Sequence, residues 1–124
     1  MDRTIVHFEI PANNPAKLSD FYSKLFGWKF ENMSTQGMPD YWMIKTKAKD
    51  EDMGLNGGMM KKMDPNQRPV NYVLVESVDE FVKKLQQLGG KVIVPKTEIP
   101  KMGQFAVALD PEGNSFGIWE STEQ

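Results

Sequence analysis

Phe26-Gly-Trp-Lys-Phe30 and Leu88-Gly-Gly-Lys-Val92 are two similar stretches, 62 residues apart, that decide the fold of this chain. In each, an apolar residue closes a helical pattern and a glycine follows, where a helix can end in a left-handed turn. A lysine and an apolar residue then begin a β-forming segment. The same helix-to-strand corner therefore occurs twice within 124 residues. This repetition predicts two halves of the same design.

The first half reads as a strand, a helix and three more strands. Residues 4–10 are rich in β-forming side chains. Asn14 suits the N-cap of a helix and Pro15 its first position, and an apolar stripe runs from Leu18 to the expected end at Gly27. Further strands are expected at residues 28–30, 40–46 and 55–61.

The second half repeats this order after a linker at residues 63–69, which holds two prolines. Ser77 and Glu80 have the spacing of a capping box at the start of a helix, and Gly89 follows its end. Strands are expected at residues 70–75, 91–94, 104–109 and 114–120. The prediction is an α+β fold in one domain, with modules 1–62 and 70–124. Their strands should form a cupped eight-stranded mixed sheet with the helices on its outer face.

Composition excludes several classes of protein. The chain has no cysteine, one histidine and a formal net charge of −2. Disulfides, iron–sulfur clusters, zinc fingers and thiol catalysis are excluded, as is any site that needs two imidazoles from one chain. The charge argues against nucleic acid as a partner. No apolar run approaches the ~20 residues of a membrane helix, and no signal peptide is recognisable, so we expect no membrane association and a cytoplasmic location.

Five short motifs carry a resemblance to a known family. They are His7-Phe-Glu-Ile-Pro11, Asp20-Phe-Tyr22, Leu25-Phe-Gly-Trp28, Leu88-Gly-Gly90 and Asp110-Pro-Glu-Gly-Asn114. Together with the duplicated βαβββ pattern, this ordered set resembles the vicinal oxygen chelate superfamily of glyoxalases, bleomycin resistance proteins and extradiol dioxygenases. The resemblance covers the whole chain. It implies a cavity that often holds a divalent metal, and a homodimer.

The resemblance also implies four metal ligands: a histidine on the first strand, a glutamate on the fourth, a histidine on the fifth and a glutamate on the eighth. Only His7 stands at such a position in this sequence. The fourth strand has no carboxylate, the fifth begins Val70-Asn71, and the last position is Gly117. Glu120 is a possible substitute, although it lies an odd number of residues further along the strand and should point to the other face. We therefore expect a degenerate metal site and no cofactor, with Zn, Ni, Mn or Fe as the alternative.

His7 has three possible roles. It could be a metal ligand, or a general base that Glu9, two residues along the strand, orients. It could also be a polar residue that contacts a ligand. The expected ligand-binding residues line an aromatic and methionine-rich cup that suits a small apolar or aromatic molecule. They are His7, Glu9, Trp42, Met59, Asn71, Phe105 and Trp119.

Three functions remain open at this point. The first is a small-molecule-binding protein with a degenerate metal centre, which the loss of three ligand positions favours. The second is a metal-dependent lyase or dioxygenase with a rearranged site that uses His7 with Glu9 or Glu120. The third is an accessory protein that binds a partner through an edge strand or a dimer face. Whether the chain is an enzyme is left open; a glyoxalase-like or dioxygenase-like activity is expected if it is.

Overall fold

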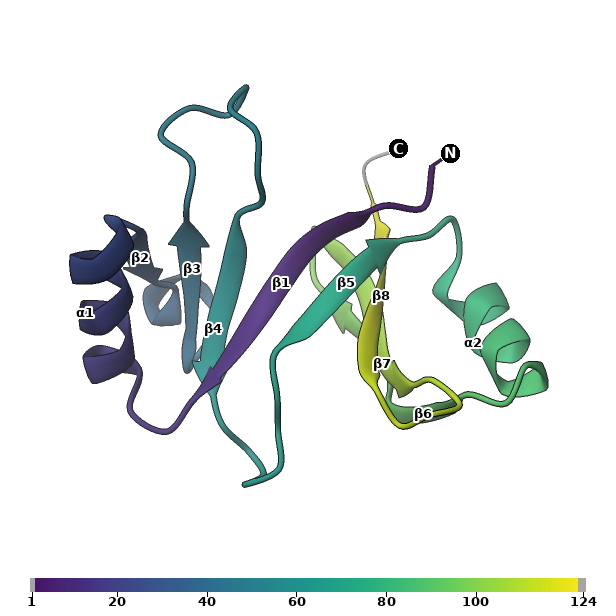
Figure 1. The fold of residues 1–124 in the computed structure, drawn as a ribbon. Helices are drawn as coiled ribbons and strands as arrows, with labels where there is room; N and C mark the ends of the chain where they lie inside the picture. The colour runs from purple at the N-terminus through teal and green to yellow at the C-terminus, as the bar shows by residue number, and fades with distance from the viewer. Residues whose placement is uncertain (1, 123–124) are drawn as a thin grey trace. The chain divides into compact units, whose positions relative to one another are not determined.

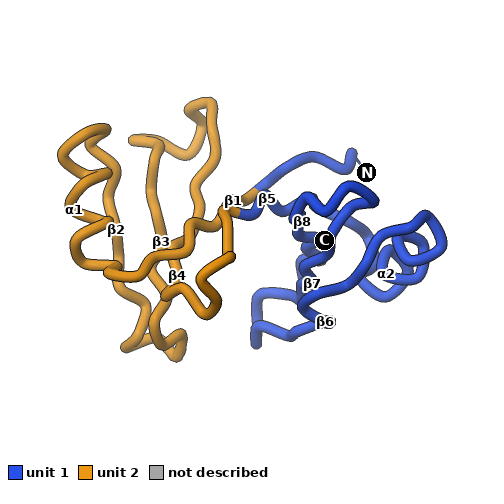
Figure 2. Tube along the Cα trace, turned by 60° about the horizontal axis from the view of Figure 1, so that its bottom comes forward, with its two compact units in different colours: residues 1–6, 70–124 blue, residues 7–69 orange. Residues whose placement is uncertain are grey.

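The computed structural model describes residues 2–122 and divides the chain into two compact units (Figure 2). Unit 2 is His7–Pro69, and unit 1 is Met1–Val6 with Val70–Gln124. The first strand, β1 (Ile5–Ala12), begins in unit 1 and continues in unit 2. The division at Pro69 and Val70 falls at the end of the proline-containing segment 63–69.

Unit 2 is a four-stranded mixed sheet with one long helix (Figure 1). Its elements after β1 are α1 (Pro15–Phe26), β2 (Lys29–Asn32), a short 3₁₀ helix η1 (Ser34–Gln36), β3 (Tyr41–Lys45) and β4 (Gly57–Lys61). The strand order is β2-β3-β4-β1. β1 is parallel to β4, and the other two neighbouring pairs are antiparallel.

Local sequence explains where α1 begins and ends. The Asn14 side chain accepts a hydrogen bond from the Lys17 backbone N–H at 3.2 Å, and Pro15 occupies the first turn, where it has no N–H to leave unpaired. Gly27 ends the helix with φ 77°, a left-handed conformation that glycine adopts without strain. The sequence prediction for this helix is confirmed at both ends.

The core of unit 2 lies between α1 and one face of its sheet. Ala12, Ile44 and Met59 are buried there, and Leu18 of α1 packs against them. The apolar stripe of α1 is only partly used, because Phe21, Leu25 and Phe26 are 54%, 57% and 58% exposed. The helix therefore covers the sheet with a narrower side than its sequence pattern indicates.

Unit 1 has the same plan. Its elements are the start of β1, β5 (Val70–Leu74), α2 (Val78–Gln87), β6 (Lys91–Ile99), β7 (Gly103–Leu109) and β8 (Ser115–Ser121). The order β5-β8-β7-β6 again sets a parallel pair, β5 and β8, beside antiparallel neighbours. The predicted cap is present, since the Ser77 hydroxyl accepts a hydrogen bond from the Glu80 N–H at 3.2 Å. Val75, Val78, Ala106 and Ile118 form the core between α2 and its sheet.

Residues at the start of the chain complete unit 1. The Leu74 N–H donates to the Thr4 carbonyl at 2.9 Å, and Arg3 forms a two-pronged ion pair with Glu76. The Arg3 guanidinium also lies 5.4 Å from the centre of the Phe81 ring on α2. Residues 2–6 thus belong structurally with the second half of the sequence.

One strand is longer than the sequence predicts. β6 continues from the expected residues 91–94 through Pro95 to Ile99. Its pairing with β7 has register shifts on both sides of Val94, and β6 is the last strand in the order. A proline is tolerated on such an edge strand, where its missing N–H interrupts no ladder on the outer side.

The predicted α+β class and the duplicated βαβββ plan are confirmed. Residues 2–122 hold eight strands in mixed pairing and two α-helices. None of their helices has the length and apolar character needed to cross a membrane.

Candidate functional site

The candidate site lies on the face of the unit 2 sheet that α1 does not cover. Gly58 of β4 pairs with Glu9 on one side and Met43 on the other. Paired residues point to the same face of a sheet, and neighbours along a strand point to opposite faces. Since Met59 points into the core under α1, Glu9, Met43 and Gly58 belong to the opposite face. We call this the open face of unit 2.

Three polar side chains form a hydrogen-bonded group on the open face. The Tyr41 hydroxyl of β3 donates to Glu9 Oε2 at 3.0 Å and lies 3.1 Å from His7 Nε2. His7 Nε2 and Glu9 Oε2 are 3.8 Å apart, too far for a good direct hydrogen bond. The Tyr41 hydroxyl is thus the link between the two residues of β1. His7, Glu9 and Tyr41 are named the polar triad below.

The side chains of the polar triad are largely buried. The His7 side chain is 28% exposed and the Glu9 side chain 14%. The pKa of Tyr41 is raised above its ordinary value, first by burial, then by the negative charge of Glu9 and the hydrogen bond to it. The phenol therefore keeps its proton at neutral pH and donates it to the carboxylate.

The proton count fixes the direction of the second hydrogen bond. A phenol has one proton, and that of Tyr41 goes to Glu9. With that proton directed at Glu9, we assign to His7 the tautomer that carries a proton on Nε2, which donates to the phenolic oxygen at 3.1 Å. The triad is a directional chain from His7 through Tyr41 to Glu9.

Gly58 makes room for the Tyr41 ring. A Cβ atom at position 58 would overlap the hydroxyl oxygen and Cζ of Tyr41. Any side chain there would therefore push the ring end away from His7 and Glu9. Glycine at this position and tyrosine at position 41 are needed together for the polar triad to form.

The matching face of unit 1 has the same backbone register. Gly117 of β8 pairs with Tyr72 of β5 and Val107 of β7, as Gly58 pairs with Glu9 and Met43. Gly117 is also the residue at the last ligand position that the family resemblance implies. Stepping two residues along each strand gives the remaining counterparts. His7 corresponds to Val70, Glu9 to Tyr72, Tyr41 to Phe105 and Met60 to Trp119.

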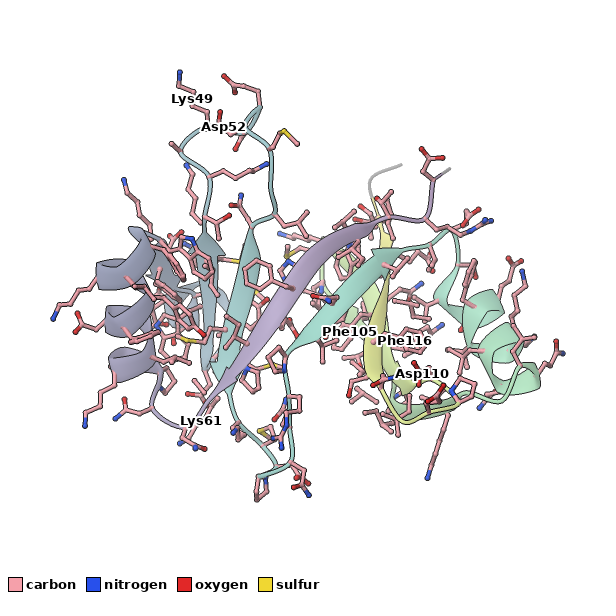
Figure 3. All side chains as sticks on the ribbon, viewed as in Figure 1. Lys49, Asp52, Lys61, Phe105, Asp110 and Phe116 are labelled. Carbon is pink, nitrogen blue, oxygen red and sulfur yellow. The ribbon has the colours of Figure 1, made fainter. Side chains whose placement is uncertain are left out.

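These counterparts in unit 1 form an apolar cluster. Val70, Tyr72 and Val107 are buried, with Phe105 and Trp119 packed against them. The Tyr72 and Phe105 rings meet edge to face with their centres 6.0 Å apart. Figure 3 labels Phe105 on this sheet. Gly117 lies under Tyr72, because a Cβ atom at 117 would overlap the Tyr72 ring. The polar positions of unit 2 are hydrophobic positions here.

The structure brings only two of the sequence-predicted site residues into the polar triad, His7 and Glu9. Trp42 and Met59 pair with each other and belong to the core under α1. Phe105 and Trp119 belong to the apolar cluster of unit 1. Asn71 is exposed and, by strand alternation, lies on the face opposite to Tyr72.

Glu120 caps a helix. Its Oε1 accepts hydrogen bonds from the Val78 backbone N–H at 2.9 Å and from Gln104 Nε2 at 3.0 Å. A carboxylate at the N-terminus of α2 satisfies a helical N–H and complements the helix dipole. Because side chains alternate along a strand, the sequence predicts that Glu120 and Gly117 lie on opposite faces of the sheet. The contact of Glu120 with α2 agrees with this prediction.

Tyr41 belongs to the candidate site but is absent from the residues that the sequence predicts for it. It lies beside Trp42 on the same predicted strand, and the sequence does not show which of the two faces α1. A usable signal is the Gly57-Gly58 pair, because glycine within a strand marks a close approach by another group. That group is Tyr41.

The residues present do not fit the metal site that the family resemblance implies. Within residues 2–122, no three His, Asp or Glu side chains gather where they could hold an ion. Gly117, at the last implied position, is covered by the Tyr72 ring, and its counterpart on β4, Gly58, is covered by the Tyr41 ring. His7, at the one matching position, is hydrogen-bonded through Nε2 to Tyr41.

Comparison with known proteins places the chain in a family. The model of the glyoxalase/bleomycin resistance protein/dioxygenase superfamily matches residues 4–118. The chain belongs to this superfamily. Superfamily relatives include DnrV of Streptomyces peucetius, an anthracycline biosynthesis protein, which is 25% identical over 128 residues covering 90% of this chain and 45% of DnrV. A glyoxylase-like domain-containing protein of Didymella fabae is 27% identical over 113 residues, covering 89% of this chain and 88% of that protein.

Solved structures share the superfamily fold. The methylmalonyl-CoA epimerase of Mycobacterium tuberculosis superposes with a TM-score of 0.64 at 12% identity, over 95% of this chain and 87% of the epimerase. At this identity the likeness concerns the fold alone. The chain spans less than half the length of the first curated superfamily relatives that it matches.

Proposed function

We propose that this superfamily member binds a small apolar or aromatic molecule on the open face of unit 2. The polar triad would hold one polar group of that molecule, and Met43 and Met60 would contact its apolar part. The observation that carries the proposal is the triad itself. Three polar side chains are hydrogen-bonded and largely withdrawn from water on the sheet face that the helix leaves uncovered.

Stability alone does not explain this arrangement. Burying polar groups costs free energy even when they are hydrogen-bonded to one another, and apolar residues often serve a core as well or better. The counterpart positions in unit 1 show that this fold accepts apolar residues there. Retention of His7, Glu9 and Tyr41 in unit 2 is therefore better accounted for by a binding role.

The relatives support the choice of test ligands. One superfamily relative is named for anthracycline biosynthesis, and another is a glyoxylase-like domain-containing protein. We would therefore test aromatic molecules, an anthracycline among them, together with small carbonyl compounds. Each aromatic probe should be paired with an analogue that lacks its polar group.

Methionine methyl groups offer a direct readout of the proposed site. With ¹³C-methyl-methionine labelling, a ligand on the open face should shift the NMR signals of Met43 and Met60. The signal of Met59, in the core on the other side of the sheet, should move less. Met53 and Met63, which are highly exposed, serve as controls for non-specific contact. Equal shifts of all these methyl groups would speak against a site on this face.

A pair of matched variants separates the site from the rest of unit 2. Tyr41→Phe removes the hydroxyl that joins His7 and Glu9, and we expect about a 10-fold loss in affinity for a ligand with a polar group. Tyr22→Phe makes the same change on α1, where the ring packs against Trp28, and should leave affinity unchanged. If no probe binds in the micromolar range, the binding proposal fails.

A second candidate role is proton transfer, with His7 as general base. Glu9 would orient His7 through Tyr41, because His7 Nε2 and Glu9 Oε2 are 3.8 Å apart and the Tyr41 hydroxyl lies within hydrogen-bond distance of both. If a bound probe is turned over, His7→Ala should abolish the reaction and Glu9→Gln should lower its rate. An unchanged rate in His7→Ala would end this candidate.

Homodimeric assembly and a cytoplasmic location complete the proposal. Both come from the family resemblance and the sequence. Light scattering on the purified protein would test the first. A single mass at the monomer value of 14.1 kDa over a wide concentration range would contradict it.

A further inference from the structure

We propose that the Tyr41 hydroxyl takes the place that a divalent cation would need between His7 and Glu9. Tyr41 and Gly58 would then form a device that excludes a metal from this half of the molecule. The proposal concerns the protein without a small-molecule ligand, so its outcome does not depend on whether the binding function proposed above is correct.

Geometry is the first argument. The hydroxyl oxygen lies within hydrogen-bond distance of both potential ligand atoms, 3.1 Å from His7 Nε2 and 3.0 Å from Glu9 Oε2. An ion such as Zn²⁺ would need the same two atoms at about 2.0–2.2 Å. An ion and the phenolic oxygen cannot both lie there. Tyr41 would have to move before His7 and Glu9 could share a cation.

The proton count is the second argument. In the chain from His7 through Tyr41 to Glu9, Nε2 of His7 donates a proton to the phenolic oxygen. A metal ligand must offer a lone pair, so binding through Nε2 requires this proton to leave. The hydroxyl therefore opposes a metal both by occupying space and by holding His7 in the wrong tautomer.

The glycine beneath the ring is the third argument. A glutamate at position 58 would supply a third ligand beside His7 and Glu9, but its Cβ atom would overlap the Tyr41 hydroxyl. A carboxylate at 58 and the Tyr41 ring in its present position are mutually exclusive. Unit 1 repeats the pattern independently, with the Tyr72 ring over Gly117.

The first test uses the protein as it is. His7 is the only histidine, so its ring ¹⁵N signals need no assignment by mutation. We expect Nε2 to carry a proton, and we expect Zn²⁺, added up to about 1 mM, to leave the His7 signals unchanged. Binding of one Zn²⁺ per chain at micromolar concentration, with a shift of the His7 ring signals, would overturn the proposal.

The second test replaces Tyr41 first and then Gly58 as well. Tyr41→Ala should bind Zn²⁺ about 10-fold more tightly than the wild type in a calorimetric titration. Addition of Gly58→Glu should bring the gain to about 100-fold, because a third protein ligand is added. The same double variant with His7→Ala should lose the gain. Tyr22→Ala, on α1, is the matched control and should behave as the wild type.

Every result of this second test decides the question. An affinity in Tyr41→Ala equal to that of the wild type would mean that the hydroxyl does not exclude the ion, and the proposal would fall. Circular dichroism checks that each variant is folded. If the double variant unfolds, Tyr41→Ala decides, because it adds no atoms at position 58. If that variant also unfolds, the His7 signals of the wild type decide.

Discussion

The open face of unit 2 and the matching face of unit 1 are built on the same strand register but carry opposite chemistry. In unit 2, the residues around Gly58 are a histidine, a glutamate and a tyrosine joined by hydrogen bonds. In unit 1, the residues around Gly117 are apolar or aromatic and mostly buried. The two faces therefore share one strand register with a glycine at its centre, and they differ in the side chains around that glycine.

The comparison also assigns different tasks to the two tyrosines that cover these glycines. Tyr72 is 4% exposed and meets Phe105 edge to face, so its ring acts as part of a hydrophobic core. Tyr41 uses its hydroxyl to bridge two polar residues. We therefore expect unit 1 to depend on the ring of its tyrosine and unit 2 on the oxygen.

The largest expected effect is on stability at Tyr72. Tyr72→Ala should lower the free energy of unfolding by about 3–4 kcal/mol, because it removes a buried aromatic ring and leaves a cavity. Tyr41→Ala should cost less, since its ring end lies among polar groups. Urea denaturation followed by circular dichroism would measure both. Equal losses of unfolding free energy in the two variants would show that both tyrosine rings serve as core residues, and would contradict the different roles assigned to them.

Substitution of the two glycines should again destabilise unit 1 more than unit 2. Gly117→Ala should destabilise by about 2–3 kcal/mol, because the new Cβ meets the base of the Tyr72 ring, which is close to its backbone and tightly packed. Gly58→Ala should cost about 1–2 kcal/mol, since it meets the far end of Tyr41, which can swing aside.

A second readout separates these two variants. In Gly58→Ala, displacement of Tyr41 should change the ¹⁵N signals of His7, whereas Gly117→Ala should leave the ring hydrogen bond of His7 intact. A greater loss of stability in Gly58→Ala than in Gly117→Ala would contradict the assignment of tasks.

A smaller effect is expected from the way each helix is capped. The side chain of Asn14 caps α1 from the preceding residue, whereas α2 also receives Glu120 from a strand of its own sheet. Glu120→Ala should cost about 1 kcal/mol through loss of this cap. Glu112→Ala, in an exposed turn of the same unit, is the control. A loss of stability that appears only when metal ions are present would instead favour Glu120 as a ligand.

The smallest effect concerns the connections between strands. A tight turn at Asp110–Asn114 joins β7 to β8, whereas a longer loop that carries Lys49 and Asp52 joins β3 to β4 (Figure 3). Hydrogen bonds from the Asn114 backbone and then from its side chain lower the pKa of Asp110 below its ordinary value. Ionised Asp110 therefore stabilises the folded state.

The sign of the pH dependence follows. A carboxyl with a lowered folded pKa contributes its stability above the unfolded value, about 3.9, and loses it as the pH falls through the lower folded value. Wild type and Asp110→Ala should differ most near neutral pH and converge in acid. A difference that grows as the pH falls would refute this role for Asp110.

The sequence carried enough information to predict the elements and their order. Asn14, Pro15 and Gly27 mark the ends of α1 through interactions within a few residues, and Ser77 marks the start of α2 in the same way. Such signals are local, so they can be read without the rest of the chain. The continuation of β6 through Pro95 could not be predicted, because a proline interrupts the local pattern and only pairing with β7 sustains the strand.

The site was harder to predict for a different reason. Alternation along a strand shows that Tyr41 and Trp42 point to opposite faces, but it does not show which face is covered by the helix. That choice depends on the pairing of β3 with β4 and on the packing of α1, both of which are tertiary. The family resemblance indicates His7, and the spacing of two along the strand indicates Glu9. Tyr41 reaches them from a strand that begins 34 residues after His7.

The membership of residues 2–6 in unit 1 has a consequence for fragments of this protein. A cut between Pro69 and Val70 would leave the second fragment without Thr4, which accepts a hydrogen bond from Leu74, and without Arg3, which pairs with Glu76. The first fragment would contain this N-terminal segment, which pairs with β5 in the intact chain. The two pieces would therefore be complementary rather than independent, which makes this junction a natural place to split the chain for a reassembly reporter.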